Sequence, residues 1–185
     1  KILIEEFNPY LIQKVDLNKF LSFKNIIKKI NSESEIEFIS KKFSRDHIDN
    51  LNLKIDLAYG RMNYSKKLSI SDNFLNCSGD INFLEDFPLL FFNCNIKSND
   101  KQKFLKLFSI KSKSKKETLN IEVEGNLSIL NKKINFKKIL VNEEYKASKE
   151  DLKYFKKTFE NIVLKNFFLE SFNYNNIKEF ILEIS

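Results

Sequence analysis

The sequence of 185 residues predicts a β-rich α+β fold: a mainly antiparallel, curved sheet of hairpins with a short helix near 100–108 and a longer helix near 148–164. Apolar and polar residues alternate along several stretches, which is the pattern of strands with one apolar and one solvated face. The alternation gives way to the 3.6-residue spacing of a helix in two clear segments. A chain of this length can bury a core as one domain.

The first part of the chain is difficult to interpret. Residues 1–44 contain a mixed apolar spacing that favours a short helix near 23–30, a break at 32–34 and a strand over 36–43. We treat this part as a lead-in to the same fold. Because Lys1 stands inside an apolar run and no initiator Met precedes it, we expect the chain to be a piece of a longer protein.

A β-rich domain is expected over 45–164. Apolar residues alternate on odd numbers over 51–59, and Gly60 then shifts the phase to even numbers. A glycine at such a shift is typical of a bulge or a bend in a sheet. We further expect a turn at 65–67 and a new strand that begins at Leu68.

Residues 73–97 form the clearest hairpin. Apolar positions fall on odd numbers before Glu85-Asp86 and on even numbers after it. Antiparallel pairing about this point puts all apolar partners on one face, with Cys77 directly opposite Cys94 at a Cα separation of about 4.5–5.5 Å. The two cysteines are then either small core residues or a disulfide, which requires an oxidising compartment.

The next elements are a short helix and a second hairpin. Asn99 or Asp100 can cap the helix over 100–108. Alternation returns over 119–129 and, after a turn, over 134–141. Gly125 lies in phase with the apolar side of this hairpin, as Gly79 does in the first one. Both glycines are expected where the sheet curves or another strand lies close.

The strongest helix signal covers 148–164. Ser148, with Asp151 three residues later, resembles a capping box. Leu152, Phe155 and Phe159 begin an apolar stripe that lies opposite lysines. The remainder, 165–185, is predicted to be a tail or a truncated helix.

The net charge of +7 raises the question of nucleic acid or an anionic membrane surface. Thirty of the 32 basic residues are Lys, and Arg occurs only at Arg45 and Arg61. Lys, Ile, Asn and Phe, all with AT-rich codons, make up just over half of the chain, so we attribute the charge to genomic bias. We therefore expect a solvated lysine surface and no nucleic-acid partner. The chain has no apolar run long enough to span a bilayer and no signal-peptide pattern.

The sequence offers no catalytic or metal-binding constellation. His47 is the only histidine, and the acidic residues that flank it, Asp46 and Asp49, stand in a polar segment. Cys77 and Cys94 lack the spacing of a zinc site, and three glycines in the whole chain cannot build a phosphate-binding loop. We expect no cofactor, no metal and no enzymatic activity.

With these elements in order, the region from about 50 to 164 resembles the AsmA-like family of bacterial envelope proteins. The resemblance is carried by the runs GDINF at 79–83, FPLLFF at 87–92, DKQKFLKLF at 100–108 and LNIEVEGNL at 119–127, with the strand at 134–141 and the helix at 148–164. It implies a body on the periplasmic side of the inner membrane, an anchor in a part of the parent protein outside this chain, and a curved sheet with an apolar groove. It also implies a role in outer-membrane biogenesis or in phospholipid transport.

Three functions remain open from the sequence. The first is a non-enzymatic envelope module whose apolar sheet face binds phospholipid acyl chains; the second is a structural or protein-binding β domain with a closed core. The third is a nonspecific nucleic-acid binder. For the first two, the same residues are either lipid-facing or core: Leu53, Ile55, Leu57, Ile81, Phe83, Leu90, Phe92, Ile121, Val123 and Leu127.

Overall fold

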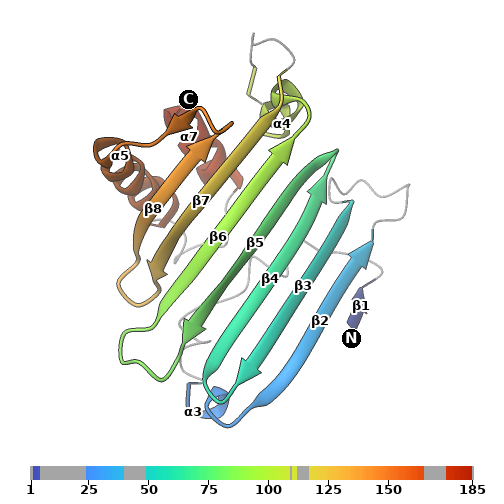
Figure 1. Ribbon diagram of the computed structural model, residues 1–185, viewed down its shortest axis with the longest axis vertical. Helices are drawn as coiled ribbons and strands as arrows, with labels where there is room; N and C mark the ends of the chain where they lie inside the picture. Colours follow the sequence, from blue (N-terminus) through green and yellow to red (C-terminus); the bar gives the residue numbers. More distant parts are fainter. Residues whose placement is uncertain are drawn as a thin grey trace.

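The computed structural model describes residues 2–4, 24–39, 49–108, 110–111, 117–164 and 174–184. Within these residues, nine strands form one sheet in which each strand pairs with the next one along the chain (Figure 1). β1 pairs parallel with β2, and every other pair is antiparallel. The strands are β1 Ile2–Ile4, β2 Asn31–Ile39, β3 Asn50–Ala58, β4 Arg61–Ile70, β5 Asn73–Asn82, β6 Leu89–Ser98, β7 Leu119–Ser128, β8 Lys133–Val141 and β9 Tyr145–Lys146. The predicted β-rich, mainly antiparallel sheet is confirmed.

The helices lie at the ends and at one side of this sheet (Figure 1). The described helical segments are α3 Lys24–Ile27, α4 Lys101–Leu107, α5 Lys149–Phe159, the π-helical turn η1 Glu160–Leu164 and α7 Tyr174–Ile184. The short helix expected near 100–108 is confirmed as α4, whose first turn is capped by Asp100. The longer predicted helix is also confirmed, except that its last five residues are π-helical.

The two predicted hairpins have the expected pairing. In the first, β5 and β6 pair with Cys77 opposite Cys94 and Ile81 opposite Leu90. In the second, β7 and β8 pair along their length with a register shift at Glu124/Gly125. The sequence pattern was sufficient here because most apolar residues of each strand fall on one face.

Both in-phase glycines lie where another strand comes close, as expected. A Cβ atom at Gly79 would overlap the backbone carbonyl of Phe91, and one at Gly125 would overlap the carbonyl of Asn135. Backbone atoms cannot move aside as a flexible side chain can. No larger residue fits at either position without a shift of the strands.

Three expectations about the first strands are wrong. Gly60 is not a bulge: Tyr59 and Gly60, both with positive φ, form the two-residue turn between β3 and β4. Such a turn makes the apolar face change from odd to even numbers, which explains the phase shift. Residues 65–67 do not turn but lie inside β4, and residues 32–34 lie inside β2. In both places polar residues, such as Lys66 and Ser34, occupy positions on the apolar face and conceal the alternation.

The buried core gathers where β3 turns into β4 and β5 leads toward β6. Ile81 and Phe83 are 1% and 0% exposed, and they pack with Ile27 of α3 and with Ile129, which follows β7. Leu57, Met62 and Leu90 pack against this cluster. The short helix α3 therefore closes this end of the apolar face.

The C-terminal helices cover the apolar face at β8. Phe136 of β8 stands edge-on to Phe92 of β6 and to Phe159 of α5, with ring centroids 6.4 and 5.8 Å apart. Phe159 in turn stands edge-on to Phe180 of α7 at 5.2 Å. This row of four rings joins the sheet to both helices. Of the two expectations for 165–185, a tail or a truncated helix, the second describes α7, Tyr174–Ile184.

Some expectations fall on residues outside the described part. These are residues 40–43 of the strand expected over 36–43, the segment that holds His47, and residues 165–173 between η1 and α7. β1 and β2 join the same sheet as the rest, in agreement with the lead-in being part of one fold.

Candidate functional site

The candidate site is the middle of the apolar sheet face, which we call the central face. Its half-buried apolar candidates lie on β3, β6 and β7 and point to the same side as the core: Leu53, Ile55, Leu57, Leu90, Phe92, Ile121, Val123 and Leu127. Leu57 and Leu90 also pack against the buried cluster. The other two candidates, Ile81 and Phe83, belong to the buried cluster under α3. Of the ten residues left between core and lipid-facing, two are therefore core.

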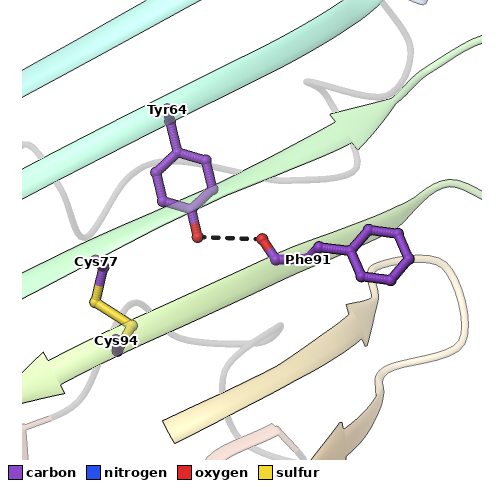
Figure 2. Close-up of a disulfide and its surroundings, with 4 residues drawn as sticks. All are labelled: Tyr64, Cys77, Phe91 and Cys94. Carbon is purple, nitrogen blue, oxygen red and sulfur yellow. Dashed lines mark hydrogen bonds between the residues drawn. A yellow bond between two sulfur atoms is a disulfide. The ribbon is translucent and has the colours of Figure 1, made fainter. Parts of the chain in front are cut away.

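A disulfide crosses the central face. Cys77 of β5 and Cys94 of β6 are bonded, with Cα atoms 4.1 Å apart, slightly closer than the predicted spacing (Figure 2). The bond confirms the predicted register and selects the second of the two readings of these cysteines. It ties the middle of β5 to β6, just before the pairing between these strands is interrupted at Gly79 and Asp80.

The ring of Tyr64 lies over that interruption. Figure 2 shows it reaching from β4 across β5 toward β6, and its hydroxyl donates to the Phe91 carbonyl at 3.4 Å. Because Gly79 has no side chain, the ring has room to cross β5. Burial raises the pKa of the Tyr64 hydroxyl, and the negative charge of Asp80 raises it further. Tyr64 is therefore a neutral hydrogen-bond donor at physiological pH.

Lys66 is the one charged residue at an apolar-face position of the described strands. In β4 it pairs across to Leu53 on one side and to Cys77 on the other. Burial lowers the pKa of its ammonium group. No hydrogen bond or ion pair holds this group in the part of the chain that the structure describes.

The opposite face of the sheet is polar, and its charges pair with one another. Lys54 and Glu35 lie 3.4 Å apart, and Lys138 and Glu122 lie 2.7 Å apart. A depression of about 340 Å³ over β4–β6 is lined mainly by polar residues: Ser65, Lys66, Lys67, Asn76, Cys77, Ser78, Asn93 and Asn95.

The described residues bring together no metal-binding cluster. No group of three His, Cys, Asp or Glu side chains with metal-binding geometry occurs among them. Asp49, which flanks His47 in the sequence, accepts the backbone N–H of Ser71 at 2.6 Å. None of the helices in the described ranges is long and apolar enough to cross a bilayer.

Comparisons with models of protein families, with characterised proteins and with solved structures found no match to this chain. The argument about function thus depends on the geometry of the central face. The residue on it that the sequence pattern missed is Lys66. It could have been found from the two-residue turn at Tyr59-Gly60, because that turn sets even numbers on the apolar face of β4.

Proposed function

We propose that this chain is a non-enzymatic module of a bacterial envelope protein of AsmA-like type, a curved α+β sheet whose central face binds phospholipid acyl chains. In this proposal it acts on the periplasmic side of the inner membrane, in phospholipid transport or outer-membrane biogenesis. Its anchor is a part of the parent protein outside this chain, and it needs no cofactor and no nucleic acid.

One observation carries the proposal: apolar side chains of β3, β6 and β7 such as Leu53, Ile55 and Val123 share one face and stay only half-buried, whereas the same face is buried under α3, where Leu57 and Leu90 pack against the buried cluster, and is contacted by helices at β8. A contiguous apolar face that helices leave uncovered is a binding surface in many soluble proteins. An acyl chain laid on it would contribute about 0.8 kcal/mol for each buried CH₂ group, without any polar specificity.

The disulfide supports the location in the envelope. Disulfides persist in oxidising compartments such as the periplasm and are rare in the cytosol. The bond between Cys77 and Cys94 therefore agrees with a body outside the inner membrane.

The alternative of a structural or protein-binding domain also has an observation in its favour. Ile81, Phe83, Ile27 and Ile129 form a fully buried cluster, which is how a closed core begins. In this alternative, the central face is covered by protein and takes up no lipid.

The test is binding of a fluorescent fatty acid, together with mass spectrometry of lipids that co-purify with the protein. Ile55→Asp places a charge on the central face and is expected to abolish probe binding, because a carboxylate is costly to bury beside acyl chains. Asn76→Asp, on the polar face opposite Lys67, is the matched control and should bind as the wild type does.

Two results would contradict the proposal. A folded wild-type protein that takes up neither probe nor lipid excludes lipid binding by this segment. If Ile55→Asp instead loses its cooperative unfolding transition, the central face is core and the structural alternative holds.

A further inference from the structure

The position of Lys66 is unusual for a lysine. Strand positions on the apolar side of β2–β8 hold aliphatic, aromatic, small or uncharged polar residues, and Lys66 alone among the described ones carries a charge. Its neighbours across the ladder, Leu53 and Cys77, offer no counter-charge. The lysine thus places a cation in the middle of an otherwise apolar surface.

This cation lacks the compensation that other lysines have. Lys54, Lys137 and Lys138 form ion pairs with glutamates on the polar face. Burial lowers the pKa of the Lys66 ammonium, and no acceptor among the described residues contacts it. A desolvated charge without a partner destabilises a protein unless a ligand supplies the partner.

The surroundings of Lys66 specify the rest of such a ligand. From β4 the central face continues over β5, β6 and β7 to the row of phenylalanines at β8. Four strand spacings cover about 19 Å, which exceeds the roughly 15 Å that acyl chains span in one leaflet of a bilayer. The disulfide lies directly on this path, next to Lys66, and adds no charge.

We propose that Lys66 binds the anionic head group of an amphiphile, a carboxylate or a phosphate monoester, while the acyl chain lies on the central face toward β8. This inference depends on the proposed function, because it assigns a ligand class and a specificity residue to the same surface. It predicts that the protein prefers anionic amphiphiles to neutral ones of the same chain.

The experiment measures the dissociation constants of oleate, oleoyl lysophosphatidate and oleyl alcohol by displacement of a fluorescent fatty acid at neutral pH. The wild type should bind at least one of the two anions about tenfold or more tightly than the alcohol, the effect expected of a contact to a charged group. Lys66→Met should remove that preference and leave the affinity for the alcohol unchanged. Lys66→Arg should retain the preference.

Lys67→Met is the matched control, since Lys67 is the next residue in β4 and is exposed on the polar face. It should bind all three ligands as the wild type does. A preference for oleate identifies a fatty-acid carboxylate as the source of the charge, and a preference for lysophosphatidate identifies a lipid phosphate. Either result supports the inference.

Failure of the inference differs from failure of the proposed function. If all three ligands bind the wild type equally, the acyl-binding face stands and the role of Lys66 is refuted. If Lys66→Met and Lys67→Met weaken anion binding equally, the effect is one of net charge and the inference is again refuted. If none of the ligands binds, the proposed function itself fails.

Discussion

The apolar face of the sheet has two regions built from the same alternation but packed differently. At β8, Phe136 meets Phe159 of α5, and Ile134 is 5% exposed. In the middle of β3–β6, residues of the same type and orientation, such as Ile55, remain half-buried. The strand pattern therefore determines which face is apolar, whereas the packing of helices on that face determines where it becomes core.

The largest expected difference between buried and central positions comes from a pair of isoleucines. Ile81→Ala removes a side chain that is 1% exposed and should cost about 2–5 kcal/mol of unfolding free energy, because a cavity remains in the cluster under α3. Ile55→Ala, on the same face, should cost markedly less. Urea-induced unfolding followed by circular dichroism measures both, and equal losses would mean that the central face is packed as core.

The disulfide should contribute the next largest effect, because the central region has little buried core of its own. The bond closes a segment whose ends are 17 residues apart. Replacing both cysteines by alanine should cost about 3 kcal/mol, as expected for a loop near this length. Reductant should lower the stability of the wild type by a similar amount and leave the double variant unaffected. A wild type that is insensitive to complete reduction would contradict this expectation.

The N-terminal cap of α5 stabilises the helix that packs on β8. Ser148→Ala removes the acceptor for the Asp151 N–H and should cost about 1 kcal/mol. The backbone hydrogen bond from Ser148, and then the Tyr145 hydroxyl, lower the pKa of the Asp151 carboxyl. Its contribution is therefore present above the pKa of the unfolded chain and lost as the pH falls below about 4. The difference in unfolding free energy between wild type and Asp151→Asn should vanish in acid, and a constant difference would refute this account.

The smallest effect concerns Lys66 in the absence of ligand. Lys66→Met removes a desolvated charge and should raise the unfolding free energy by more than about 0.5 kcal/mol, the usual limit for a surface substitution. Lys67→Met should stay within that limit. Thermal unfolding of the two variants side by side gives the comparison, and a destabilised Lys66→Met would show that the ammonium has a partner.

The gain from Lys66→Met should depend on pH. The pKa of Lys66 is lowered in the folded state. Between that value and the pKa of about 10.4 for an ordinary lysine, the unfolded chain holds a proton that the folded protein lacks. The stability of the wild type therefore rises with pH in this alkaline window. The advantage of the variant should be complete below the folded-state pKa of Lys66 and disappear above the window.

Much of the sheet was predictable from the sequence, and the reasons are local. The hairpins β5–β6 and β7–β8 keep the alternation over most of their length, so even the partner of Cys77 followed from counting residues. The capping box at Ser148 and Asp151 was readable because its two hydrogen bonds form within one helical turn.

The parts that could not be predicted depend on contacts distant in the sequence. Lys66 and Ser34 are polar residues at apolar-face positions, and no local pattern explains them. Because they interrupt the alternation, the sequence did not reveal the whole of β4 or the first half of β2. Whether Ile81 is core or surface depends on Ile27, more than fifty residues earlier, in a helix of four residues. The sequence therefore indicated the face of the candidate site but not its boundaries or its one charged residue.

The order of the strands has a consequence for how such a protein can change in size. Since each strand from β2 to β9 pairs antiparallel with its neighbour in sequence, a hairpin inserted at a turn would find both partners without rearranging the others. Every added hairpin would widen the sheet by about 10 Å. The width of the apolar face therefore increases with the number of hairpins. Duplication of a segment of about twenty to thirty residues would widen it, as repeat proteins lengthen by adding units.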